Sequence, residues 1–147
     1  MKRILTIVFL SLFAVTAFAQ EADAIVGDYH AVQNSDEFKV RISKNDDGTY
    51  KGQIFWLKND IDPKTGLKLT DTRNPDKSLR DVPCDQVVLF DGLQYNPKKS
   101  RWDGTKIYDP QRGLKAHLTI TLEKEGKIRV KGKLLGISET VVWDKIR

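Results

Sequence analysis

Apolar and polar residues alternate along much of the chain after residue 20, and this pattern predicts β-strands rather than helices. In LKAHLTITLEK, residues 114–124, an apolar side chain occupies every second position up to Leu122. The stretch KIRVKGKLL, residues 127–135, repeats the pattern, and Glu125-Gly126 supplies the turn between the two. Each strand of this predicted hairpin therefore has one face directed to a core and one directed to water.

A second hairpin is predicted where FKVRI, residues 38–42, and TYKGQIFWL, residues 49–57, flank the turn-forming run Asn45-Asp46-Asp47-Gly48. Its second strand should place Tyr50, Gly52, Ile54 and Trp56 on one face. Further strands are predicted at Ile25–Gln33, Gln86–Phe90, Thr105–Tyr108 and Glu139–Ile146. The total is about eight or nine strands joined mostly by short turns.

So many short strands predict an all-β fold, a single closed or nearly closed antiparallel β-barrel. Closure lets every strand bury its apolar face and leaves no exposed edge. A β-sandwich is the alternative, but the strands follow one another as hairpins, without the long crossovers of Greek keys. One long polar loop, Lys58–Gln86, interrupts the series. Because connections of this length in compact domains are commonly functional, the loop is the first place to look for a site.

The first residues have the composition of a secretory signal peptide. Lys2 and Arg3 precede an apolar run from Ile4 to Phe18, which ends in Ala17-Phe18-Ala19, a pattern typical of a cleavage site. We therefore expect residues 1–19 to be removed and residues 20–147 to form one β-barrel domain with no transmembrane segment. The expected location is periplasmic or extracellular.

Charge and motifs exclude several classes of function. Loss of Lys2 and Arg3 lowers the formal charge from +5 to +3, so nucleic acid is not an expected partner. No catalytic motif is present, and no cofactor is predicted. Asp60-x-Asp62 lacks the spacing of a calcium loop, and neither histidine has metal-ligand spacing, so no metal site is predicted. Cys84 is the only cysteine, excludes an intrachain disulfide, and is expected to be a buried apolar residue.

Four motifs resemble a known bacterial family. They are DTRNPDKSLR (71–80) and WDGTKIYDPQRG (102–113), supported by DGTYKGQIFWL (47–57) and the final VVWDKI (141–146). In this order they resemble the family catalogued as domain of unknown function 2147, over nearly all of the chain after residue 20. The resemblance implies a small exported protein with a lipocalin-like barrel, and it implies no particular activity.

The two most specific motifs also suggest a ligand-binding site. We expect polar residues of the long loop and residues of the 101–113 hairpin to converge at one barrel mouth: Asp71, Asn74, Arg80, Trp102, Tyr108 and Asp109. There Arg80 would bind a carboxylate or phosphate, beside an aromatic wall. Alternatively, Arg80 pairs with Asp71 or Asp109 and pins the loop over the barrel end.

The function predicted from these features is binding of a small apolar or amphipathic anionic ligand at the barrel mouth. The alternative is a non-enzymatic protein of the cell envelope that binds glycan, lipid headgroup or protein through its loops. An enzyme ranks last, because no nucleophile or acid–base pair is identified. Four cations lie on one face of the strand predicted at residues 127–135: Lys127, Arg129, Lys131 and Lys133. We interpret this face as exposed to solvent, and the alternative is that it binds anionic glycan or lipid headgroups.

Overall fold

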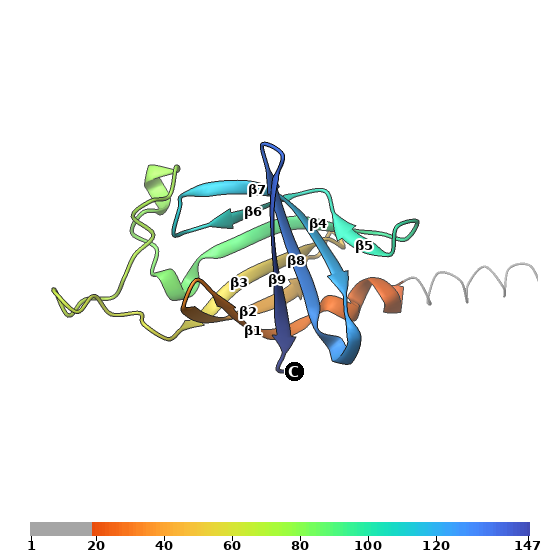
Figure 1. Cartoon of the computed structure of the whole chain (residues 1–147), viewed down its shortest axis with the longest axis horizontal. Coiled ribbons are helices and arrows are strands. Elements are labelled where there is room, and N and C mark those ends of the chain that lie inside the picture. The colour runs from red at the N-terminus through yellow and green to blue at the C-terminus, as the bar shows by residue number, and fades with distance from the viewer. Residues whose placement is uncertain (1–18) are drawn as a thin grey trace, which may run out of the picture.

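The computed structural model describes residues 19–147, and the expected signal peptide therefore lies almost entirely outside the described residues. The described chain forms nine β-strands and four short 3₁₀ helices (Figure 1). The strands are β1 (Gly27–Gln33), β2 (Asp36–Lys44), β3 (Tyr50–Leu57), β4 (Val88–Asn96), β5 (Arg101–Asp103), β6 (Lys106–Asp109), β7 (Leu114–Leu122), β8 (Ile128–Leu134) and β9 (Ile137–Lys145). The 3₁₀ helices are η1 (Asp23–Ile25), η2 (Lys77–Leu79), η3 (Cys84–Gln86) and η4 (Lys124–Gly126).

The strands form one antiparallel sheet that closes on itself, which confirms the predicted barrel. Neighbouring strands follow the order β5-β4-β3-β2-β1-β9-β8-β7-β6, and a further pairing of Trp102 with Ile120 joins β5 to β7. Eight strands therefore complete a ring, and β6 is an additional strand beside β7. Strands β5 and β6 occupy successive parts of the gap between β4 and β7 (Figure 1).

Irregular pairing of β2, β3 and β4 shifts the pattern that the sequence predicted. In β2 and β3, Lys39 pairs with Trp56 and Val40 pairs with Ile54, so Phe55 is an extra residue. As a result Trp56 lies outside the barrel, with the Lys39 ammonium 4.7 Å from its ring centroid, and its predicted place on the Ile54 face is wrong. The strand predicted to end at Phe90 continues to Asn96, because Gly92 has a φ of 73° and accommodates one of the two register shifts between β3 and β4.

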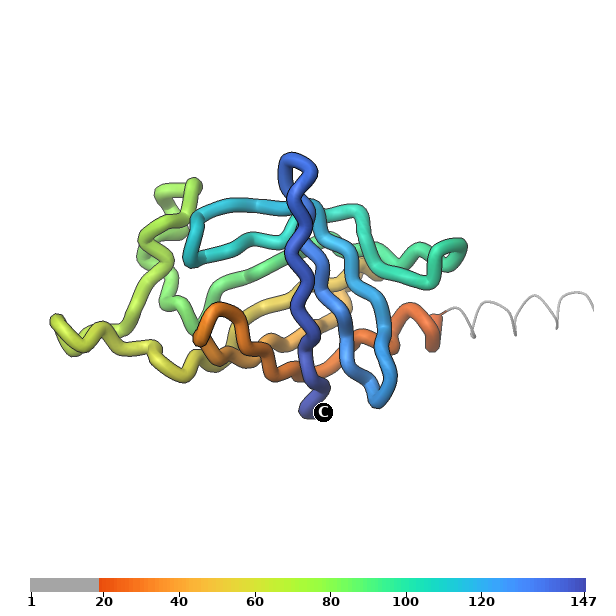
Figure 2. Tube along the Cα trace, in the orientation of Figure 1, coloured from red at the N-terminus to blue at the C-terminus, as the bar shows by residue number. Residues whose placement is uncertain are grey.

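The long loop is irregular but anchored. Two isolated bridges hold it, Ile61 with Lys68 and Thr70 with Pro83. Within the loop, the Asp76 carboxylate caps η2 by accepting the backbone N–H of Ser78 at 2.9 Å. Figure 2 shows this loop, in yellow to green, extending from one end of the barrel, while the segment that contains η1 lies at the other end.

Asp28 of β1 joins β2 to the chain just after β9, at one end of the β1–β9 pairing. Its side chain is 6% exposed and accepts two hydrogen bonds from Arg41, at 2.7 and 2.9 Å, and one from Arg147 at 2.8 Å. Hydrogen bonds from Arg41, opposed by desolvation and supported by Arg147, lower the pKa of Asp28 from 3.8 to about 2. Asp28 therefore favours the folded state only while its carboxyl is ionised.

We expect this carboxyl to make stability pH-dependent in acid. Because the folded-state pKa is the lower one, the stabilisation is complete above the unfolded value of 3.8 and is lost as the pH falls towards about 2. The loss amounts to about 2 kcal/mol, measurable as the free energy of unfolding in urea at a series of pH values. Asp28→Asn should lose stability at neutral pH and flatten the profile below pH 4. An unchanged profile would contradict this assignment.

Candidate ligand-binding cavity

The barrel interior is hollow at one end. A cavity of about 510 Å³ lies inside it, within the range that holds one small ligand. Its walls are mainly apolar, with Phe38, Ile54, Leu89, Ile107, Val130 and Trp143 among the lining side chains. These residues come from six strands. Leu57, turned inward by the bulge at Phe55, also lines the wall.

Small side chains leave this space open. Ala116 on β7 and Gly132 on β8 both line the cavity, and a Cβ atom built on Gly132 would lie only 3.3 Å from the Ala116 Cβ. Bulky residues at these two positions would extend into the centre of the barrel. The volume therefore depends on a few small inward residues as much as on the ring of eight strands.

The opposite end of the barrel is closed by large buried residues. Ile25, Tyr29, Tyr50 and Trp102 are each at most 2% exposed. The Trp102 indole Nε1 donates to the Ala22 carbonyl at 2.9 Å, and the Tyr50 hydroxyl donates to the Asp23 carboxylate at 2.6 Å. Burial raises the pKa of Tyr29 to about 12, so that its hydroxyl stays a donor, here to the Ile25 carbonyl at 2.8 Å. The segment 22–25 thus acts as a plug.

Trp102 belongs to this closed end and does not line the cavity. Its predicted place beside Tyr108 at the mouth is therefore wrong. Trp102 pairs with Ile120, whereas Tyr108 pairs with Lys115, five residues earlier on β7. At about 3.3 Å per residue, the two aromatic residues are roughly 16 Å apart along the strand.

The open end is a mouth bordered by the β1–β2, β6–β7 and β8–β9 turns. We use the word mouth for Gln33, Asp36, Asp109–Arg112, Leu135, Ile137 and Glu139, which line the cavity at or next to these turns. Strands β1 and β9 pair only at Tyr29–Lys145 and His30–Asp144. Beyond these pairs the strands separate, and the Phe38 and Trp143 rings meet edge to face with centroids 6.3 Å apart. Both rings line the cavity, so towards the mouth the seam between β1 and β9 is closed by packing rather than by backbone hydrogen bonds.

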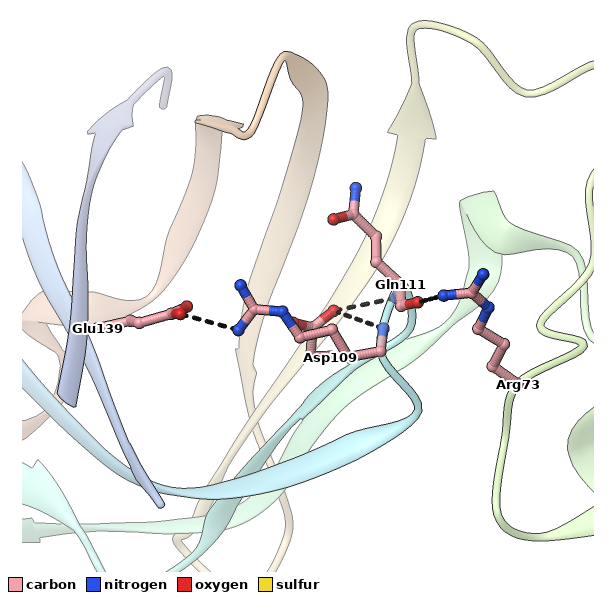
Figure 3. A network of polar contacts seen from close by, with 5 residues as sticks. Arg73, Asp109, Gln111 and Glu139 are labelled. Carbon is pink, nitrogen blue, oxygen red and sulfur yellow. Dashed lines mark hydrogen bonds and ion pairs between the residues drawn. The ribbon is translucent and has the colours of Figure 1, made fainter. Parts of the chain in front are cut away.

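An arginine between two acidic residues gives the mouth its polar character (Figure 3). Arg112 donates to Glu139 at 2.8 Å, and its Nε lies 3.7 Å from the Asp109 carboxylate. Asp109 also accepts the backbone N–H groups of Gln111 and Arg112, which fixes the turn after β6. The Arg73 guanidinium donates to the Gln111 carbonyl and ties the long loop to this turn. The hydrogen bond to Glu139, followed by the negative charges of Glu139 and Asp109, raises the pKa of Arg112, so its guanidinium stays charged.

The predicted loop residues form a separate cluster. The Asp71 carboxylate, 2% exposed, accepts the Tyr108 hydroxyl and the Asn74 amide, each at 2.7 Å. Burial and the hydrogen bond to Asp71 raise the pKa of Tyr108. Arg80 donates to the Asn74 carbonyl at 2.8 Å and forms no ion pair with a described residue, so its expected pairing with Asp71 or Asp109 is wrong. The cluster attaches the loop to β6.

The six predicted residues are therefore divided among three places. Tyr108 and Asp109 line the cavity, while Asp71, Asn74 and Arg80 lie in the loop cluster behind Tyr108. Trp102 closes the far end. Whether any of them binds a ligand stays a prediction.

Sequence reasoning missed Arg112 and Glu139 as residues of the mouth. Glu139 was visible in the pattern, since it falls in the inward series with Ile137, Val141 and Trp143, where an acidic side chain is out of place.

Cys84 was expected to be buried, and it is half-buried in the cavity wall. Burial is the main cause of a raised pKa of its thiol, and the negative charges of Asp71 and Asp85 raise the pKa further. In residues 19–147 no three His, Cys, Asp or Glu side chains are grouped as metal ligands. No helix in this part of the chain is long and apolar enough to span a bilayer.

Comparison with known proteins agrees with the barrel. Protein HP1028 from the human pathogen Helicobacter pylori, described as belonging to the lipocalin family, is similar in structure, with a TM-score of 0.63 and 17% sequence identity. The match covers 84% of this chain and 83% of that one, and at this identity it shows a lipocalin-like fold alone. No curated protein matches the chain significantly. Residues 27–145 match the model of the family described as "Uncharacterized protein conserved in bacteria (DUF2147)", and the chain belongs to that family.

Proposed function

We propose that the protein binds one small apolar or amphipathic molecule inside the barrel. The supporting observation is the cavity itself, about 510 Å³ of mainly apolar space that is plugged at one end and open at the other. An apolar molecule that enters such a space leaves water without requiring new polar partners. Lipocalin-like barrels of eight strands suit this role, because their interior is wide enough for one small ligand.

Charges at the mouth narrow the class of ligand. Among the lining residues, Asp36, Asp109 and Glu139 are acidic, while Arg112 and Lys115 are basic. Arg112 is already paired with Glu139, so an anionic headgroup would have to displace a carboxylate to reach it. We therefore favour a ligand with a long apolar part and a neutral or hydrogen-bonding end over the anionic ligand expected from Arg80. Gln33, Asn59 and Gln111 also line the cavity and offer amide groups for such an end.

We also propose that the protein is exported after removal of residues 1–19. The support comes from the sequence, with its basic start, apolar run and Ala-Phe-Ala ending. Cleavage after Ala19 would retain Ala22, Asp23 and Ile25, whose contacts close the barrel. The intact mass of protein recovered from a bacterial periplasm tests this, since a start other than Gln20 or an uncleaved chain would contradict it.

Filling the cavity tests the binding proposal. Ala116→Phe should weaken binding of the neutral apolar fluorophore N-phenyl-1-naphthylamine at least about tenfold, because the added ring takes up space that the probe needs. Fluorescence titration measures this affinity. Native mass spectrometry of the protein as purified, without the probe, shows whether a small molecule is already bound. Val142→Phe adds similar bulk on the outer face of β9, where Val142 is 43% exposed, and should leave the affinity unchanged.

Failure of this test has a definite meaning. Equal affinities for Ala116→Phe and wild type would place the probe outside the barrel. Wild-type protein that neither carries a cargo nor binds the probe would contradict the proposal and favour interaction through the Lys58–Gln86 loop.

A further inference from the structure

The turn between β8 and β9 places a leucine where turn chemistry disfavours one. Leu134 pairs with Ile137, so Leu135 and Gly136 form a two-residue hairpin loop, and their φ values are 49° and 81°. Loops with two positive φ values favour asparagine followed by glycine, because a larger side chain crowds its own backbone in this region. The β1–β2 turn uses Asn34 and Ser35 at φ values of 49° and 75°. Folding alone would therefore favour asparagine at position 135.

Leu135 also gains nothing from burial. It is 93% exposed, and Ile137 beside it is 72% exposed. Both border the mouth of the cavity, together with Leu114, which is 49% exposed. An exposed aliphatic residue held in an unfavourable backbone conformation stabilises neither the turn nor the core. We define the apolar tip as Leu135, Gly136 and Ile137.

Behind the apolar tip lies a face of unpaired cations. Lys131 and Lys133 are exposed on the outer face of β8, and Lys133 pairs through the backbone with His117, which pairs in turn with Lys106 of β6. Neither Lys106, Lys131 nor Lys133 forms an ion pair with a described residue. By contrast, the predicted cation row begins with two residues that are paired, Lys127 with Asp144 and Arg129 with Glu123. Of the four cations in this row, the two nearest the tip are therefore the ones whose charge is uncompensated.

We propose that the apolar tip and this basic face dock the protein on an anionic lipid bilayer. Leu135 and Ile137 insert among the acyl chains, and Lys131 and Lys133 lie among the anionic headgroups. A bilayer fits better than a protein partner, because the exposed apolar surface is a narrow tip with charge behind it rather than a broad flat patch. The tip borders the cavity mouth, so docking places the mouth close to the membrane surface. The docking itself does not depend on what the cavity holds.

Vesicle flotation tests the proposal, with the N-terminus of each preparation established by intact mass. Wild type should float with vesicles of phosphatidylcholine and phosphatidylglycerol, and much less with phosphatidylcholine alone. Leu135→Asn should lower the partition coefficient at least about tenfold, because most of a leucine side chain no longer leaves water. Its unfolding temperature should equal or exceed that of wild type, since asparagine suits the turn. A folding defect therefore does not explain the loss.

Charge variants provide a matched pair. Lys131→Gln with Lys133→Gln should reduce binding to the anionic vesicles about tenfold, and high salt should do the same to wild type. Lys98→Gln with Lys99→Gln removes equal charge from exposed residues of the β4–β5 turn and should change little. Ala116→Phe should float like wild type, which separates docking from binding in the cavity. Wild type that ignores anionic vesicles, or Leu135→Asn that floats equally well, would overturn the proposal.

Discussion

Trp102→Ala is expected to lower the free energy of unfolding by about 3 to 5 kcal/mol, the usual cost of removing a buried tryptophan. Trp102 is 2% exposed, its ring lies 4.8 Å from that of Tyr95, and its indole holds the plug through Ala22. Its backbone pairing with Ile120 is also the one that closes the ring of strands. Urea unfolding followed by circular dichroism measures the loss.

Two further variants show which contact matters. Trp102→Phe keeps an aromatic ring but removes the donor to the Ala22 carbonyl, and should cost less than the alanine variant. Trp56→Ala removes a tryptophan from the outer face, where it packs under Lys39, and should cost about 1 kcal/mol or less. Under conditions in which it remains folded, Trp102→Ala should bind N-phenyl-1-naphthylamine like wild type. If Trp102→Ala lost binding of the probe while its stability stayed unchanged, Trp102 would be a ligand-binding residue, as the sequence analysis predicted.

Strand positions were predictable because an antiparallel barrel with one wet face imposes a period of two on the sequence. Insertions of single residues were not predictable, since Phe55 and Gly92 look like ordinary members of a strand and a turn. The short strand Arg101–Asp103 was also missed, because three residues show no periodicity. Each miss concerns a feature set by pairing between strands rather than by local sequence.

The site was harder to predict, because nearness in sequence suggested nearness in space. Trp102 and Tyr108 are six residues apart, yet β5 and β6 run in succession along the barrel, and this extended path separates the two rings. The cavity volume depends on which inward positions carry small residues, and Ala116 and Gly132 meet only when β7 and β8 are placed in register. Glu139 was the one polar residue of the mouth that the alternation of apolar and polar positions indicated, because it occupies an inward position among apolar residues.

The two ends of the barrel differ in how they are stabilised. The closed end combines large buried rings with hydrogen bonds to the plug, and Asp28 fixes the nearby pairing of β1 with β9. At the mouth, β1 and β9 separate, and the Phe38–Trp143 contact replaces the missing backbone bonds. Because local opening is easiest where few backbone bonds must break, we expect a ligand to enter at the mouth rather than at the plug.

Asp71→Ala is expected to lower the free energy of unfolding by about 2 to 4 kcal/mol and to release the long loop from β6. The change leaves the Tyr108 hydroxyl and the Asn74 amide without their acceptor in a buried position, and each unsatisfied group costs about 1 to 3 kcal/mol. Urea unfolding measures the first effect. Limited trypsin digestion measures the second, as faster cleavage at lysines between Lys58 and Lys77.

Other variants divide the contribution of this cluster between structure and ligand binding. Tyr108→Phe removes one of the two donors and should lose about half as much stability as Asp71→Ala. Asp76→Ala removes an exposed cap of η2 in the same loop and should cost about 1 kcal/mol or less. If Asp71 instead contacted the ligand, Asp71→Ala would keep its stability and lose affinity for the cargo. Because Asp71 points to Tyr108 and Asn74 and lies outside the cavity lining, we expect the loss of stability.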